Sequence, residues 1–228
     1  MKFLLTNDDG IDAPGLEALL AAATMLGDPV VVAPVDVHSG CGHRVTTHGG
    51  LKIDKKSACR FALSGTPGDC VRLALHQIAP DIDWVLAGIN HGGNLGADVF
   101  HSGTVAAVRE AAFHGKPGIA ISQYVRKGLP FEWQRSTARI VPVLRDLLAR
   151  PHEPGTYWNI NLPHLEPDAT EPKVVFCPLD PSPLPLSFRQ EDELWHYAGN
   201  YHSRQRQVGS DVDVCFQGKI AVTRLSLV

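Results

Sequence analysis

The sequence predicts an α/β fold: a Rossmann-like, mostly parallel sheet with helices on both faces, plus a β-rich C-terminal extension or arm. Two observations support this prediction. In the first half of the chain, short apolar runs alternate with stretches whose apolar residues recur at helical spacing, which is typical of βαβ units. The apolar runs also lack in-out alternation, as expected of strands that are covered on both faces.

Four short runs are predicted as strands because each is apolar or β-branched throughout. They are Phe3–Thr6, Val30–Ala33, Trp84–Gly88 and Gly118–Ser122. Polar loops rich in glycine follow several of these runs. Because ligands of open α/β sheets bind beyond the carboxyl ends of the strands, these loops are where we expect the function of the protein.

Three helices with recognisable ends are predicted between the strands. They are Pro14 to about Gly27, Pro67 to about Ile78, and Thr104 to about His114. At the second helix, Thr66 offers an N-cap hydroxyl and Asp69 a carboxylate in the first turn. We expect Thr104 to cap the third helix, and Gly115 to end it.

The second half of the chain is less regular. The segment Trp133–Arg150 has the spacing of an amphipathic helix, and three later runs are predicted as strands: Tyr157–Leu162, Lys173–Cys177 and Lys219–Leu227. We therefore expect residues 1–150 to form the Rossmann-like catalytic core. Residues 151–228 are expected to complete the sheet, with an oligomerisation arm or hairpin within 178–215.

Composition excludes several classes of protein. The chain has 228 residues, and 21 Lys and Arg against 24 Asp and Glu give a net charge of −3, which argues against a polymeric nucleic acid as partner. With 44% hydrophobic and 20% charged residues, the chain can build a core. No apolar run suits a signal peptide or a membrane span, so we expect a soluble, cytoplasmic protein. The five scattered cysteines are expected to be reduced.

Two adjacent carboxylates, Asp8 and Asp9, directly follow the first predicted strand. Keeping both ionised is costly unless a cation lies beside them. The pair is equally consistent with a simple turn before a helix that is capped by Asp12.

Two further loops carry polar side chains. Ser39, after the second strand, is a candidate turn residue, nucleophile or oxygen ligand, and the nucleophile is the weaker interpretation because no Gly-x-Ser-x-Gly elbow surrounds it. Asn90 and Asn94 bracket a diglycine after the third strand. Amide groups in such a loop can supply ligands and hydrogen-bond donors.

The residues Ser102, Gly103 and Thr104 open the third helix, where backbone N–H groups and two hydroxyls could form a phosphate site. Taken alone, this stretch is more often just a helix cap. Together, the four loops supply hard oxygen ligands that suit Mg²⁺, Mn²⁺ or Ca²⁺ better than zinc, next to an anion site. This combination indicates phosphate ester hydrolysis by a metal-activated water.

Several ordered motifs resemble the SurE family, the survival-protein-E nucleotidases. They are Leu4–Gly10, Ala13–Gly15, Val32–Pro34, Ser39–Gly40, Gly65–Pro67, Asp69–Cys70, Gly88–Asn90, Gly93–Gly96, His101–Val105, Asn159–Pro163 and Gly209–Asp213. The resemblance implies a metal-dependent phosphatase for nucleoside 5′- and 3′-monophosphates. It also implies a C-terminal extension that assembles a homodimer or homotetramer.

By matching motif, the resemblance implies one divalent ion, Mg²⁺ or Mn²⁺, held by Asp8, Asp9, Ser39 and Asn90. Ser39 would then act through its hydroxyl oxygen. We expect Asp8 and Asp9 to be catalytic, while the identity of any general acid or base stays open because a metal-bound carboxylate is a poor base.

The resemblance likewise puts Asn94, Ser102, Gly103 and Thr104 around the phosphate, with Asn94 also catalytic. The chain departs from the family pattern at Cys41 to Thr46, where His43 and its neighbour Arg44 could reach the substrate. We therefore include His43 among the substrate-binding residues, and the preferred nucleotide stays open.

Three alternatives are also consistent with the sequence. Asp8 or Asp9 could be a covalent nucleophile, as in aspartyl-phosphate phosphatases. The activity could be broader, that of a general phosphomonoesterase or exopolyphosphatase, because a phosphate site reveals little about the leaving group. The protein could also be a non-catalytic binder of metal and nucleotide.

Overall fold

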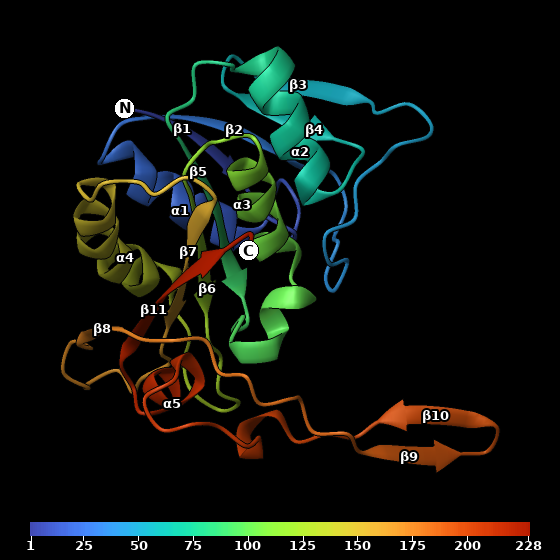
Figure 1. Ribbon diagram of the computed structural model, residues 1–228, viewed down its shortest axis with the longest axis vertical. Helices are drawn as coiled ribbons and strands as arrows, with labels where there is room; N and C mark the ends of the chain where they lie inside the picture. Colours follow the sequence, from blue (N-terminus) through green and yellow to red (C-terminus); the bar gives the residue numbers. More distant parts are fainter.

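The computed structural model describes all 228 residues and is built on one nine-stranded sheet (Figure 1). In sheet order the strands are β3 (Ile53–Ser57), β4 (Arg60–Leu63), β2 (Asp28–Pro34), β1 (Lys2–Thr6), β5 (Trp84–His91), β6 (Gly118–Gln123), β7 (Thr156–Leu162), β11 (Ile220–Ser226) and β8 (Val174–Phe176). From β4 to β7 every neighbouring pair is parallel, whereas β3 and β11 run antiparallel to β4 and β7. The predicted fold class is confirmed.

Helices cover both faces of the sheet (Figure 1). Their bounds are α1 (Pro14–Thr24), α2 (Pro67–Leu73), α3 (Gly103–Phe113), α4 (Trp133–Leu148) and α5 (Asp211–Phe216). Alternate residues of each central strand face opposite layers: Leu5 packs in the core under α1 and α4, and Leu4 in the core under α2 and α3. Burial on both faces explains why these strands are apolar throughout.

The helix ends partly match the predictions. The predicted cap of α2 is confirmed, because Thr66 Oγ1 accepts from the amide of Asp69 at 3.3 Å and the Asp69 carboxylate accepts from the amide of Thr66 at 2.9 Å. After Leu73 the chain continues into a wider helical turn, Ala74–Ile78. The prediction that Thr104 caps α3 is wrong: the cap is Ser102, whose Oγ accepts from Val105 N at 3.0 Å.

Two strands, β3 and β4, and the α-helix α5 were not predicted, nor was the 3₁₀ helix Gly96–Phe100. Every residue of β3 is exposed and three of its five side chains are charged, so this edge strand has no apolar run. The strand β4 has only four residues and α5 only six, too few for a periodic pattern.

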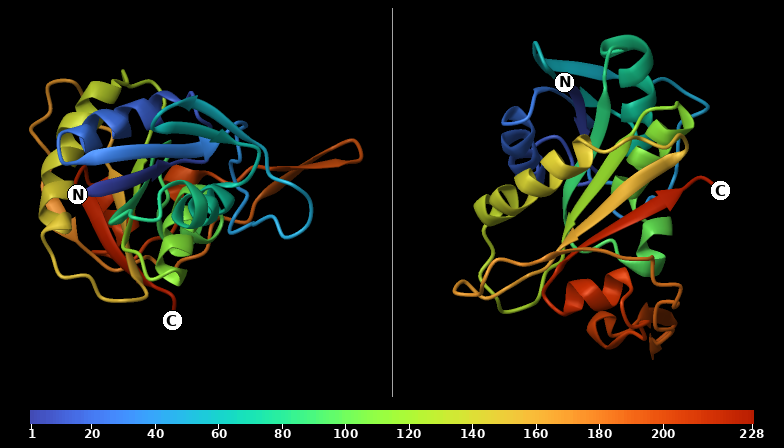
Figure 2. Two further views of the ribbon diagram at one scale, coloured as in Figure 1. Left: turned by 90° about the horizontal axis from the view of Figure 1, so that it is seen from above. Right: turned by 60° about the vertical axis from the view of Figure 1, so that its left-hand side comes forward.

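The C-terminal part adds strands to the sheet and also forms a separate hairpin. The strands β7, β11 and β8 extend the sheet beyond β6, while the hairpin of β9 (Phe188–Glu191) and β10 (Leu194–Tyr197) projects from the body (Figures 1 and 2). The chain returns through a 3₁₀ turn, Tyr201–Ser203, and α5, so the projecting part is shorter than the predicted range 178–215. None of the helices has the length and apolarity needed to cross a membrane.

Candidate active site

The strand order reverses between β1 and β5, which creates the crevice where open α/β sheets bind ligands. Four predicted metal ligands meet at this crevice: Asp8 and Asp9 after β1, Ser39 after β2, and Asn90 at the end of β5. They line one cavity of about 450 Å³. The shared edge of the parallel strands thus brings together side chains up to 82 residues apart in sequence.

The cavity also contains part of the predicted phosphate site. Asn94 and Ser102 line the same cavity, next to His101. Because α3 begins at Gly103, the amides of its first turn lack intrahelical acceptors and the positive end of the helix dipole lies at this point. Such a helix start favours an anion.

Asp8 and Asp9 are held without a cationic partner. Asp8 is buried, and burial raises its pKa to about 6, against the hydrogen bond from Thr104 and with a smaller contribution from the charge of Asp9. Burial also raises the pKa of Asp9, opposed by the amide of His91, which donates to Asp9 Oδ2 at 3.3 Å. Two desolvated neighbouring carboxylates favour a bound cation.

The donor set fits a hard divalent ion. Asn90 Nδ2 donates to Gly92 O at 2.8 Å, which leaves its Oδ1 free to act as a ligand beside the Asp8 and Asp9 carboxylates and the Ser39 hydroxyl. All four donors are oxygens, as Mg²⁺ and Mn²⁺ prefer. The chain contains no group of three or more His, Cys, Asp or Glu side chains placed to hold a metal ion, and all five cysteines are free.

Asn94 is held by two buried asparagines of β7 that were not predicted as site residues. Asn161 Oδ1 accepts from Asn94 N at 2.8 Å, while the side-chain amides of Asn159 and Asn161 both donate to Asn94 O. The Asn94 side chain itself donates to Ser122 Oγ at 2.8 Å. The signal in the sequence is the pair of asparagines in an otherwise apolar strand, since a fully buried amide needs a specific partner.

The start of α3 packs closely against Asp8. A Cβ atom added to Gly103 would lie 2.8 Å from Asp8 Cβ and 2.9 Å from Cys41 Sγ, so only glycine fits there. The Thr104 side chain is fully buried and its hydroxyl donates to Asp8 Oδ1. Thr104 therefore contacts the carboxylate and does not line the cavity.

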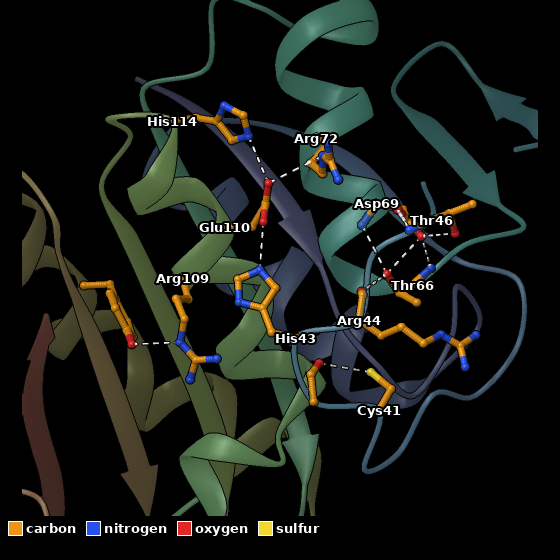
Figure 3. Close-up of polar contacts among 12 residues, drawn as sticks. Cys41, His43, Arg44, Thr46, Thr66, Asp69, Arg72, Arg109, Glu110 and His114 are labelled. Carbon is orange, nitrogen blue, oxygen red and sulfur yellow. Dashed lines mark hydrogen bonds and ion pairs between the residues drawn. The ribbon is translucent and has the colours of Figure 1, made fainter. Parts of the chain in front are cut away.

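His43 takes a different position from the one expected of a substrate-binding residue. It does not line the cavity, and its Nε2 lies 2.7 Å from Glu110 Oε2 on α3 (Figure 3). His114 Nε2 lies 2.9 Å from the other oxygen of the same carboxylate. Burial raises the pKa of Glu110, but the hydrogen bonds from both histidines outweigh it, so the pKa is lowered.

The loop that carries Ser39 is therefore fixed to both α2 and α3. Besides the contact from His43 to α3, Thr66 Oγ1 donates to the carbonyl of Arg44 at 2.6 Å, and the Asp69 carboxylate accepts from Thr46 N at 2.7 Å (Figure 3). The unusual His43-Arg44 stretch thus acts on the position of the loop.

An open α/β sheet whose switch point combines paired carboxylates with a helix N-terminus defines a class of proteins that bind a cation and an anion together. Within this class, residues 3–180 match the family model described as survival protein SurE. The chain belongs to the SurE family.

Relatives and one solved structure agree with this membership. The chain is 51% identical to a protein of Nostoc sp. (strain PCC 7120) that is provisionally named a 5′-nucleotidase, over 99% of both chains. It is 42% identical to "5′-nucleotidase SurE 1" of Burkholderia lata, over 71% of this chain and 64% of that protein. The crystal structure of the SurE protein from Aquifex aeolicus superposes with a TM-score of 0.88 at 31% identity and covers all of this chain and 94% of that one.

Proposed function

We propose that this chain is a divalent-metal-dependent phosphohydrolase that removes phosphate from nucleoside 5′- and 3′-monophosphates. The observation that carries the proposal is the convergence of two uncompensated carboxylates and the start of α3 on one cavity. The names of the relatives support the nucleotide as substrate. The cavity thus supports the type of reaction, and the family supports the type of substrate.

In this proposal one ion, Mg²⁺ or Mn²⁺, is held by Asp8, Asp9, Ser39 and Asn90. Such an ion lowers the pKa of a bound water and polarises the phosphoryl oxygens. The protein contributes the fixed position of the ligands: Asp8 is oriented by the Thr104 hydroxyl, and Asp9 by the amide of His91. Preorganised charge of this kind is a major source of rate enhancement in enzymes.

The phosphate is proposed to lie at the start of α3, bounded by Ser102, the amides of Gly103 and Thr104, and the Asn94 side chain. Asn94 Nδ2 donates one N–H to Ser122 Oγ, which fixes the orientation of the side chain and leaves the second N–H of Nδ2 for a phosphate oxygen. The helix dipole and the first-turn amides offset part of the phosphate charge. We do not include His43 in this contact set, because its ring is engaged by Glu110.

We further infer that the hairpin of β9 and β10 forms a homo-oligomer, a dimer or a tetramer. The hairpin projects from the body, and its strands together with the residue Leu186 before β9 expose apolar side chains: Leu186, Phe188, Leu194, Trp195 and Tyr197. Exposed apolar patches of this kind are typical of protein contacts. Association with a second copy would remove them from water.

A substrate panel tests the proposed function directly. Phosphate release is measured from nucleoside 5′- and 3′-monophosphates, sugar phosphates and polyphosphate, with Mg²⁺, with Mn²⁺ and with EDTA. We expect the nucleoside monophosphates to be preferred and EDTA to stop the reaction reversibly. Equal rates across the panel would indicate a general phosphomonoesterase. Nucleotide binding without phosphate release under any metal would contradict hydrolysis.

A further inference from the structure

The cavity has an unusual balance of charge for an anion site. A third carboxylate, that of Asp98, lines it together with Asp8 and Asp9, whereas no lysine or arginine does. A divalent ion offsets two of these three negative charges. Without further compensation, the remaining carboxylate would repel a phosphate dianion.

Asp98 organises the turn that connects the two halves of the phosphate site. Its Oδ2 accepts from Leu95 N at 3.2 Å, and its carbonyl oxygen accepts from the amides of both His101 and Ser102 at 3.0 Å. The turn therefore fixes Asn94, at one end, relative to Ser102 at the other. A residue without a side-chain acceptor at this position would leave the amide of Leu95 without this partner.

The compensating charge is on Arg204, which comes from the C-terminal segment beyond the part matched by the family model. Its side chain is fully buried, and Nη1 lies 3.0 Å from Asp98 Oδ2. No other carboxylate pairs with Arg204, whose guanidinium lies 5.1 Å from the centre of the Tyr201 ring. Tyr201 also donates from its hydroxyl to Asp98 Oδ2 at 2.6 Å.

The fit around this guanidinium is tight. A Cβ atom added to Gly96 would lie 2.8 Å from Arg204 Nη2. Gly96 has a φ of +55°, a conformation that glycine adopts without strain. The backbone of the turn between Asn94 and Ser102 thus packs directly against the buried side chain of Arg204.

We propose that Arg204 is a positioning residue for phosphate binding: it neutralises Asp98 so that this carboxylate can hold the turn without repelling the anion. The inference rests on the proposed function, since it assumes a phosphate at the start of α3. Because Arg204 acts through Asp98, it need not touch the phosphate. The charge of the cavity wall is therefore set by the C-terminal segment.

The test measures binding rather than turnover, with inorganic phosphate and Mn²⁺ as the two probes in calorimetric titrations of the full chain. In Arg204→Gln the carboxylate of Asp98 loses its compensating charge. We expect the dissociation constant for phosphate, at saturating Mn²⁺, to rise at least about tenfold. The dissociation constant for Mn²⁺ should stay the same or fall, because the added negative charge attracts the cation.

A rise in the dissociation constant for phosphate without a rise in that for Mn²⁺ separates this role from a merely structural one. A disordered site would bind both probes more weakly, and that result would overturn the inference, as would unchanged phosphate affinity in Arg204→Gln. Arg204→Lys, which keeps the charge, should bind phosphate more tightly than Arg204→Gln. A wild-type protein that binds no phosphate would contradict the proposed function itself as well as the inference.

A second variant covers the case in which Arg204→Gln does not fold because the half-buried carboxylate of Asp98 is left without its cation. In Asp98→Asn/Arg204→Gln both charges are removed and the acceptor for Leu95 N is kept. We expect phosphate affinity within about threefold of the wild type, since the net charge is unchanged. A tenfold loss in this folded double variant would overturn the inference.

Discussion

The hydroxyl of Thr104 donates a hydrogen bond to Oδ1 of Asp8, across 96 residues of sequence. This contact joins the first turn of α3 to the first strand's carboxylate pair. It couples the proposed phosphate-binding end of the helix to the carboxylates that are proposed to bind the metal. The hydroxyl of Thr104 is consequently engaged by Asp8, and only the backbone amide of Thr104 is available to a ligand.

Gly103→Ala should impair the site through geometry alone. The added methyl would lie 2.8 Å from Asp8 Cβ and 2.9 Å from Asp8 Oδ2, so either the carboxylate or α3 must shift. We expect kcat/KM to fall about 100-fold, as for displacements of about 1 Å in an active site. Steady-state kinetics measure the change. Gly50→Ala is the matched control, because its Cβ would meet nothing within 4 Å, and equal activities in the two variants would contradict the prediction.

Asn161→Ala should affect both stability and activity. The change removes the acceptor for Asn94 N and one of the donors to Asn94 O, in a fully buried setting. Leaving a buried amide unpartnered costs about 1–3 kcal/mol of unfolding free energy. Chemical denaturation measures this loss, and kcat should fall with it because Asn94 is no longer held. Gln134→Ala, on the exposed side of α4, should change neither quantity.

Glu110→Gln should destabilise the protein in a pH-dependent way. Because the pKa of Glu110 is lowered in the folded protein, its charged form stabilises the fold at pH values above its ordinary pKa of 4.5, and this contribution is lost as the pH falls through the lowered value. We expect the variant to be about 2 kcal/mol less stable near neutral pH. The difference should vanish in acid. Unfolding curves from pH 3 to 7 check this, with Glu166→Gln, an exposed carboxylate, as control; a difference that is constant with pH would contradict it.

Leu194→Ser/Trp195→Ser should weaken association of the chain. Both side chains are 65% exposed on β10, so the double variant removes apolar surface from the hairpin without disturbing the core. Light scattering after gel filtration should report a smaller mass than for the wild type at equal concentration. Lys55→Ser/Lys56→Ser on the exposed strand β3 is the control and should keep the wild-type mass. A monomeric wild-type protein would contradict the inferred oligomer.

Much of the fold, and the clustering of the four predicted metal ligands around one cavity, follow from the sequence for a physical reason. Asp8 and Asn90 each follow a buried strand, and parallel strands end at one edge, so local pattern and general topology suffice to bring them together. The same reasoning cannot find Asn161 or Arg204. Their roles depend on partners 67 and 106 residues away, in Asn94 and Asp98, which no local pattern encodes.

His43 shows the opposite difficulty. Its departure from the family pattern suggests a contact with substrate, but in the structure its ring pairs with the nearby carboxylate of Glu110. A departure from a motif indicates that a residue has a particular role, but it does not show which group its side chain contacts. The edge strand β3 illustrates the same limit for the fold, since its exposed, charged residues carry no signal of pairing.

The central claim is that Asp8 and Asp9 hold the ion on which phosphate release depends. The most direct test is the initial rate of phosphate release from a nucleoside monophosphate by Asp9→Asn at fixed Mn²⁺, compared with Asp12→Asn, an exposed carboxylate three residues further on. We predict that Asp9→Asn retains less than about 1% of the wild-type rate, while Asp12→Asn keeps it. A folded Asp9→Asn protein that releases phosphate at the wild-type rate would contradict the account.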